Sequence, residues 1–104
     1  MNTRQLGTNG PLLTEIGFGA WAIGGRWKFG WGAVDDDESI KAIHRALDLG
    51  INWIDTAAAY GLGHSEEVVG RALKGRRNSA FLATKCSQIW DDAGNVRIFG
   101  GADR

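Results

Sequence analysis

The hydrophobic positions of the chain follow two different periods, and the order in which these occur predicts the architecture. Short apolar runs of the kind found in buried strands lie at residues 16–20, 51–55 and 80–84. Residues 35–49 and 65–74 instead carry apolar side chains at helical spacing, with charged side chains on the opposite face. Strands that alternate with helices form right-handed crossovers, so the pattern predicts a parallel sheet with two helices.

The ends of both predicted helices carry capping signals. Asp35, with Glu38 three residues later, forms a capping-box pattern at the start of the first helix, and Gly50 stops that helix. Ser65 is predicted to be the N-cap of the second helix, which Gly75 ends.

Residues 4–16 precede the first predicted strand and are expected to form a hairpin. Asn9-Gly10 is the strongest two-residue turn signal, and apolar or β-tolerant residues flank it on both sides. Pro11 follows directly. Because proline has no backbone N–H to donate, the second arm of the hairpin is expected to be an edge strand.

Two further segments show neither period. Residues 21–34 are rich in glycine and are predicted to be one long loop, of a length that usually has a function in compact domains. Three aromatic side chains of this loop either wall a substrate pocket or cover the top of the sheet: Trp27, Phe29 and Trp31. Residues 86–104 are predicted to be an irregular tail with a turn at residues 92–95.

The number of strands and helices limits the fold that the chain completes. Three parallel strands and two helices do not close a barrel, but they match the first third of a (β/α)8 barrel of about 250 residues. The sequence therefore predicts an α/β fold that is the first third of a (β/α)8 TIM barrel. Residues 1–104 form one partial domain, with an N-terminal β-hairpin followed by three parallel strands and two helices.

Composition and charge exclude several classes of protein. The 104 residues include 12 Lys and Arg against 12 Asp and Glu, so no basic excess supports non-specific binding to nucleic acid. No apolar run approaches the ~20 residues that span a membrane. One cysteine forms no internal disulfide, which fits a reducing, cytoplasmic setting. His44, His64 and Cys86 lack the spacing of metal ligands, so no metal site is predicted.

Candidate chemistry lies where the predicted strands end. Asp55 follows the second strand, Lys85 follows the third, and Tyr60 lies in the loop after Asp55. Carboxyl ends of parallel strands carry the active sites of such folds. An ammonium beside a phenol stabilises the phenolate and makes the phenol a stronger acid, and a carboxylate keeps the ammonium charged. Taken alone, Asp55 is equally well explained as an N-cap-like loop residue and Lys85 as a solvated strand end, but Asp55, Tyr60 and Lys85 together indicate a proton-transfer site.

Several motifs resemble those of the aldo-keto reductase family. The run Gly-Ile-Asn-Trp-Ile-Asp-Thr-Ala-Ala-Ala-Tyr-Gly at residues 50–61, followed by Ser65-Glu66, is similar to the signature of that family's second strand. Ala-Thr-Lys at residues 83–85 resembles the end of its third strand, and Gly-Phe-Gly-Ala-Trp at residues 17–21 resembles its first-strand loop. The hairpin is similar to the one that closes the bottom of those barrels.

The resemblance implies roles for individual residues. Tyr60 would be the general acid, Lys85 the partner that strengthens that acid, and Asp55 the anchor of Lys85. Asp55 would also approach the cofactor. The loop that lines the nicotinamide and substrate pocket would be formed by Gly19, Ala20 and Trp21. Trp90 is a further candidate for the substrate pocket, because the loop after the third strand arches over the same rim.

The implied reaction is the reduction of an aldehyde or ketone to an alcohol by hydride transfer. The expected cofactor is NADPH, with NADH as the alternative, and the expected partner is a small-molecule carbonyl substrate rather than a nucleic acid or a membrane. The sequence carries no signal for the oligomeric state. The family's histidine at the end of the fourth strand has no counterpart here, so activity is expected only in a full-length barrel. The alternative is a non-catalytic, cofactor-sensing auxiliary subunit or an inactive truncated fragment.

Overall fold

A three-stranded parallel sheet forms the centre of the chain. The computed structural model describes residues 1–26, 30 and 32–98. Trp27, Phe29 and Trp31, for which a pocket or covering role is predicted, lie outside the described residues. The elements, with 3₁₀ turns written η, are β1 (Thr3–Gln5), β2 (Leu12–Thr14), β3 (Phe18–Gly19), η1 (Ala22–Gly24), α1 (Asp36–Asp48), β4 (Trp53–Asp55), η2 (Tyr60–Gly63), α2 (His64–Ala72), η3 (Arg77–Ser79), β5 (Phe81–Ala83), β6 (Gln88–Trp90) and β7 (Val96–Ile98).

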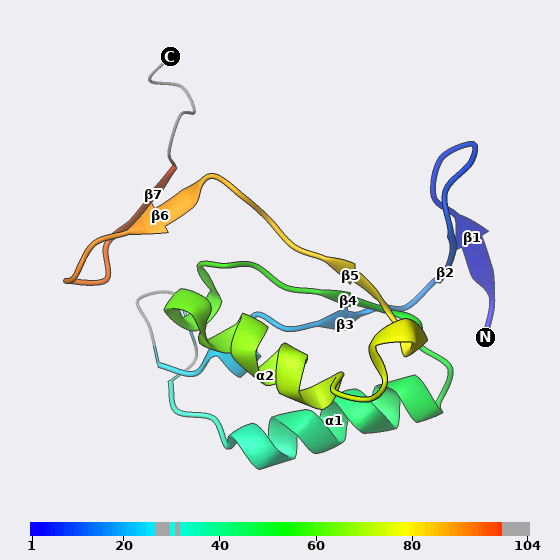
Figure 1. Cartoon of the computed structure of the whole chain (residues 1–104), viewed down its shortest axis with the longest axis horizontal. Helices are drawn as coiled ribbons and strands as arrows, with labels where there is room; N and C mark the ends of the chain where they lie inside the picture. Colours follow the sequence, from blue (N-terminus) through cyan, green and yellow to red (C-terminus); the bar gives the residue numbers. More distant parts are fainter. Residues whose placement is uncertain (27–29, 31, 99–104) are drawn as a thin grey trace.

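The sheet has the strand order β3-β4-β5, and both pairings are parallel. Ile54 in the middle of β4 pairs with Phe18 on one side and with Leu82 on the other. Figure 1 shows α1 and α2 lying next to each other on one side of this sheet. The predicted alternation of parallel strands and helices is therefore confirmed.

The core lies between the helices and the sheet. Ile43 of α1, Ile54 of β4 and Val68 of α2 are fully buried. Burial of each such side chain contributes about 1.5–3 kcal/mol relative to leaving it exposed, so this apolar layer is what fixes the helices on the sheet. β5 is less buried than β4, because its Phe81 and Leu82 side chains remain 49% and 38% exposed.

The boundaries of α1 follow the predicted capping signals. The Asp35 side chain accepts hydrogen bonds from the backbone N–H groups of Asp37 (2.9 Å) and Glu38 (3.2 Å). These two bonds satisfy donors that the first helical turn leaves without partners. No helix in the described part of the chain is long and apolar enough to cross a membrane.

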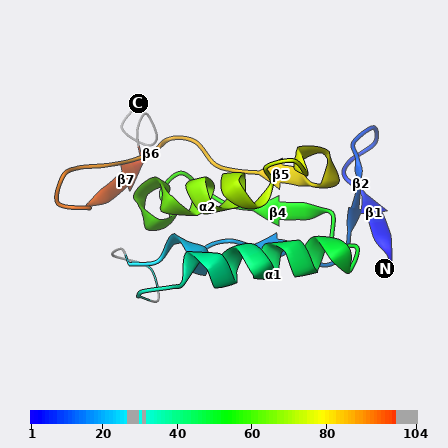
Figure 2. The same ribbon diagram turned by 60° about the horizontal axis from the view of Figure 1, so that its bottom comes forward.

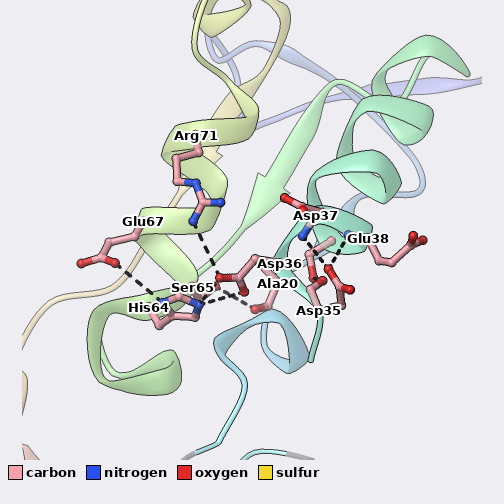
Figure 3. A network of polar contacts seen from close by, with 10 residues as sticks. Ala20, Asp35, Asp36, Asp37, Glu38, His64, Ser65, Glu67 and Arg71 are labelled. Atoms are coloured by element: carbon pink, nitrogen blue, oxygen red, sulfur yellow. Dashed lines mark hydrogen bonds and ion pairs between the residues drawn. The ribbon is translucent and has the colours of Figure 1, made fainter. Parts of the chain in front are cut away.

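Ser65 does not cap α2, so that prediction is wrong. Gly63 occupies the N-cap position without a side-chain bond, and Ser65 lies inside the first turn with no exposed surface. The Ser65 hydroxyl donates to the Ala20 carbonyl oxygen at 2.8 Å (Figure 3) and lies 2.9 Å from the Thr56 hydroxyl. The serine is recruited by tertiary partners, and these outweigh its local tendency to cap.

Asp36, in the first turn of α1, contacts two side chains of α2. His64 Nε2 lies 2.9 Å from Asp36 Oδ1, and Arg71 Nη1 lies 3.7 Å from Asp36 Oδ2 (Figure 3). Asp36 belongs to the first turn of α1, whereas His64 directly follows η2. The contact therefore fixes the end of the η2 loop against α1.

The hairpin forms, but its turn is longer than predicted. The last pair of β1 and β2 is Gln5 with Leu12, and the Leu6 N–H donates to the Pro11 carbonyl oxygen at 2.9 Å across a six-residue loop. A two-residue turn at Asn9-Gly10 would pair the next residue, Pro11, with the opposite strand. Because proline has no N–H to donate in such a pair, the regular strand pairing ends at Leu12, one residue further from the turn.

The hairpin is fastened to the start of β4. Asn52 accepts a hydrogen bond from the Thr14 N–H and donates one to the Leu12 carbonyl, both at 2.9 Å. The Trp53 indole N–H donates to the Thr14 carbonyl at 2.8 Å. As predicted, the hairpin therefore lies at the amino end of the sheet, opposite the carboxyl ends of the strands (Figures 1 and 2).

Two segments expected to be irregular contain regular structure. Within the predicted loop over residues 21–34, η1 forms a 3₁₀ turn. Within the predicted tail, β6 and β7 form an antiparallel hairpin around a turn at the predicted place. The Asp91 side chain shapes that turn by accepting from the backbone N–H groups of Ala93 and Asn95. The prediction of irregular structure is therefore wrong for β6 and β7, because strands of three residues are too short to show a two-residue period in the sequence.

Candidate active site

Two charged side chains meet at the carboxyl edge of the sheet. Asp55 is the last residue of β4 and pairs with Ala83 of β5, so Lys85 is carried two residues beyond the same edge. Lys85 Nζ donates to Asp55 Oδ1 at 2.8 Å, and both side chains are 42% exposed. The parallel register brings the two residues together, as the strand ends predicted.

Lys85 has two further partners around the same ammonium group. Its Nζ donates to the Thr56 carbonyl oxygen at 2.7 Å and lies 5.0 Å from the centre of the Tyr60 ring. The Tyr60 side chain is close enough to raise the pKa of Lys85. The structure therefore places the Lys85 ammonium in contact with the Asp55 carboxylate and beside the Tyr60 phenol.

These contacts decide the charge of Lys85. Partial burial, the largest single effect, lowers its pKa, but the hydrogen-bonding and electrostatic effects of Asp55 and Tyr60 together outweigh burial. The net result is a pKa of Lys85 raised above 10.5. Lys85 is consequently an ammonium at neutral pH, with its charge directed at the phenol.

Tyr60 is positioned by a tightly bonded loop. The segment that follows β4 turns at once, and the Tyr60 N–H donates to the Ala57 carbonyl oxygen at 3.1 Å. Tyr60 then begins η2, where Gly61 and Leu62 both have positive φ angles, of 63° and 55°. The ring is half-buried. The predicted convergence of the three residues is observed, and their catalytic roles stay predictions.

The residues predicted to line the cofactor differ in their surroundings. Gly19 is exposed at the end of β3, opposite Asp55, and Trp21 is half-buried just before η1. Ala20 is fully buried, and its N–H donates to the Asp55 carbonyl oxygen at 2.9 Å while its own carbonyl accepts from Ser65. Both polar groups of the Ala20 backbone therefore serve the fold, and its role in cofactor binding stays a prediction.

A cavity of about 330 Å³ includes Ala58, from the segment between Asp55 and Tyr60, in its lining. Its described lining residues are Ala58, Gln88, Ile89 and Trp90, and Trp21 is not among them. Contact of Trp90 and Trp21 with a substrate stays a prediction. The Gln88 amide oxygen is buried and has no hydrogen-bond partner in the described part of the chain. Sequence reasoning missed Gln88, because nothing in the local pattern distinguishes it from a surface amide.

The described residues contain no group of three or more His, Cys, Asp or Glu side chains arranged to hold a metal ion.

A sequence model described as the Aldo/keto reductase family matches residues 15–98. The chain belongs to the aldo/keto reductase family. The matched residues begin where the amino-terminal hairpin ends and include Asp55, Tyr60 and Lys85.

Two curated aldo/keto reductase relatives show how much of the family's length this chain represents. Aldo-keto reductase YhdN of Bacillus subtilis (strain 168) is 44% identical over 106 residues, which cover 100% of this chain and 30% of YhdN. The NADH-specific methylglyoxal reductase of Escherichia coli (strain K12) is 42% identical over 99 residues, which cover 92% of this chain and 29% of that protein. The chain thus spans about 30% of the length of these relatives.

Solved aldo/keto reductase structures share the fold. The holo form of AKR11C1 from Bacillus halodurans matches with a TM-score of 0.78 and 35% identity, over 95% of this chain and 30% of that one. An aldo-keto reductase from Klebsiella pneumoniae in complex with NADPH matches with a TM-score of 0.69 and 32% identity, over 82% of this chain and 28% of that one. These relatives are (β/α)8 barrels, and the hairpin, parallel strands and helices described above correspond to the first third of such a barrel. The predicted fold class is confirmed.

Proposed function

We propose that this segment supplies the proton-transfer site of a reductase that converts an aldehyde or ketone to an alcohol with NADPH. The observation that carries the proposal is the Lys85 ammonium, which lies between the Asp55 carboxylate and the Tyr60 phenol. A charged donor next to a phenol favours release of the phenolic proton. That arrangement suits the protonation of a carbonyl oxygen at neutral pH.

Each residue of the site has a separate task in the proposed reaction. A nicotinamide cofactor, when bound, supplies the hydride that adds to the carbonyl carbon of the substrate. Tyr60 gives its proton to the carbonyl oxygen, so the C=O bond becomes an alcohol and the phenolate is left beside Lys85. Lys85 stabilises that phenolate by its charge, and Asp55 holds Lys85 in place at 2.8 Å. Solvent then returns a proton to Tyr60.

The carboxyl edge of the sheet has room for the nicotinamide end of such a cofactor. Gly19 is exposed there, and a side chain built on it would meet no atom of the described residues within 4 Å, apart from its chain neighbours. NADPH is supported by the solved Klebsiella pneumoniae relative, which is in complex with NADPH. NADH is the alternative, because the name of the Escherichia coli relative specifies that cofactor. We propose NADPH as the cofactor of the complete protein.

The cavity beside the site supports a small carbonyl compound as substrate. Ile89 and Trp90 make its lining largely apolar, and the Gln88 amide is the polar group among its lining residues. Ala58 belongs both to that lining and to the segment between Asp55 and Tyr60. We propose that Trp90 and Trp21 contact the substrate. We also propose that the protein works in the cytoplasm, a reducing setting that suits its free cysteine, Cys86.

The test uses a complete barrel, made by joining residues 1–98 of this chain to the remaining part of Bacillus subtilis YhdN. Tyr60→Phe removes the phenolic proton and keeps the ring. Because general acid catalysis is typically worth about 10²–10⁴-fold, we expect kcat for reduction of an aromatic aldehyde to fall by about that factor. The dissociation constant for NADPH should change little. Reduction at the wild-type rate by the Tyr60→Phe variant would mean that another group delivers the proton.

A further inference from the structure

Two glycines from separate loops touch beside Tyr60. Gly24 ends η1, and Gly61 directly follows Tyr60 in η2. A side chain built on Gly24 would lie 2.5 Å from the Gly61 nitrogen and 2.7 Å from the Tyr60 carbonyl carbon. A side chain on Gly61 would in turn collide with the Gly24 carbonyl oxygen. Only hydrogen atoms fit between the two backbones, so η1 packs directly against the peptide unit of Tyr60.

The contact cannot relax by a movement of η1. Just before η1, Ala20 is held on both sides, because its N–H donates to the Asp55 carbonyl and its carbonyl accepts from the buried Ser65 hydroxyl. Gly24 itself is buried, and its N–H donates to the Trp21 carbonyl at 3.3 Å. η1 is therefore fixed to the same strand edge that carries Asp55.

The other side of the contact is equally constrained. Leu62, next to Gly61, has a φ angle of 55°, which residues other than glycine rarely adopt. Such a conformation persists only where the surroundings hold it. His64, at the end of η2, is fixed to Asp36 of α1 at 2.9 Å. Tyr60 thus lies on a strained turn between two fixed points, with Gly24 supporting it from one side.

We propose that Gly24 is a positioning residue for Tyr60, and this inference rests on the proposed role of Tyr60 as proton donor. The bare backbone of Gly24 lets η1 approach Gly61 closely enough to hold the phenol beside Lys85. Any side chain at position 24 pushes the Tyr60–Gly61 peptide away, because η1 is bonded to the sheet and does not yield. Misplacement of a catalytic group by about 1 Å costs roughly 100-fold in rate.

The experiment compares two glycine-to-alanine variants in the complete barrel defined above. Gly24→Ala is expected to lower kcat by about 10–100-fold, while KM and the dissociation constant for NADPH change by less than about threefold. Gly70→Ala is the matched control, because Gly70 is an exposed residue of α2 and a side chain there meets no atom within 4 Å. It should keep the wild-type kcat. Equal kcat values for the two variants would overturn the inference.

A double substitution separates this inference from the proposed function. If Gly24 acts through Tyr60, adding Gly24→Ala to Tyr60→Phe causes no further loss, whereas a general structural defect would multiply the two losses. A fall in kcat for Tyr60→Phe with none for Gly24→Ala rejects only the positioning role. An unchanged kcat for Tyr60→Phe rejects the proposed function itself.

Ser65→Ala provides a second variant if Gly24→Ala does not fold. It adds no atoms, but it removes the hydroxyl that holds the Ala20 carbonyl and so loosens the start of η1. We expect kcat to fall several-fold, with the loss again absent in the Tyr60→Phe background. Ser65→Cys, which is somewhat larger but keeps a weak donor, should restore part of the rate. A Ser65→Ala enzyme with the wild-type kcat would contradict the support that η1 gives to Tyr60.

Discussion

The charge on one lysine is central to the site. Lys85 faces the carboxylate of Asp55, the carbonyl of Thr56 and the phenol of Tyr60, which all lie within residues 55–60. Surface ion pairs usually contribute little to stability, and both partners here are 42% exposed. The value of this pair lies instead in placing a fixed positive charge against the phenol.

Titration of Lys85 gives a direct measure of this environment. We expect its Cε resonance, in the complete barrel labelled with ¹³C-lysine, to titrate with a midpoint above 10.5. Asp55→Asn should lower that midpoint, because it removes the strongest group that favours the ammonium and leaves the opposing effect of burial. A midpoint at or below 10.5 in the unmodified barrel would contradict the contacts described.

The raised pKa of Lys85 also has a consequence for stability. A group whose pKa is higher in the folded state stabilises that state fully at pH values below its unfolded value, here 10.5. The contribution is lost as the pH rises through the folded value. The Lys85 contacts are therefore intact throughout neutral and mildly alkaline conditions.

At the scale of elements, α1 has a start that depends on one side chain. Asp35→Ala removes the acceptor of the Asp37 and Glu38 N–H groups and should cost about 1 kcal/mol of stability. We expect faster hydrogen exchange at those two amides in the complete barrel. Asp37→Ala, which removes a charge from the same turn but no capping bond, is the control. Equal exchange in both variants would show that charge near the helix end, and not the cap, is what matters.

Helix caps are predicted from the sequence only where their partners are near in the chain. The Asp35 cap is a local signal, since its partners lie two and three residues away, and the structure has it as predicted. Ser65 carries a similar signal, yet its partners Ala20 and Thr56 are 45 and 9 residues distant. The spacing of residues near Ser65 in the sequence cannot predict contacts with residues so far away.

The candidate site divides in the same way. The sequence predicts that Asp55 and Lys85 meet, because the ends of neighbouring parallel strands share one edge of the sheet. It predicts that Tyr60 joins them, because Tyr60 lies only five residues after Asp55. The sequence does not predict the approach of Gly24 to Gly61, because nothing in a glycine-rich loop indicates which glycine packs against another backbone segment. The unpaired amide of Gln88 was likewise missed, because its burial depends on how β6 folds back.

At the scale of the whole molecule, the described sheet has an open side. β5 is an outer strand whose residues are all exposed, including Phe81 and Leu82. Unpaired backbone groups and apolar side chains on an exposed edge promote pairing with another chain. In a complete barrel, the next parallel strand covers this edge.

We therefore expect the 104-residue chain alone to associate and to be inactive. Light scattering after size-exclusion chromatography should show species larger than the monomer, and no NADPH oxidation should occur with a nitrobenzaldehyde. Leu82→Lys places a charge on the exposed edge and should reduce association without restoring activity. Turnover at ordinary enzyme rates by a monomer would contradict this expectation.

The attachment of the amino-terminal hairpin has a practical consequence. Asn52 and Trp53 hold β2 at the start of β4, whereas Asp55 and Lys85 lie at the other end of the sheet. The first residue therefore emerges on the side away from the chemistry (Figure 1). An enzyme immobilised through its amino terminus, or fused there to a cofactor-recycling partner, would keep the mouth of its barrel turned toward the solution.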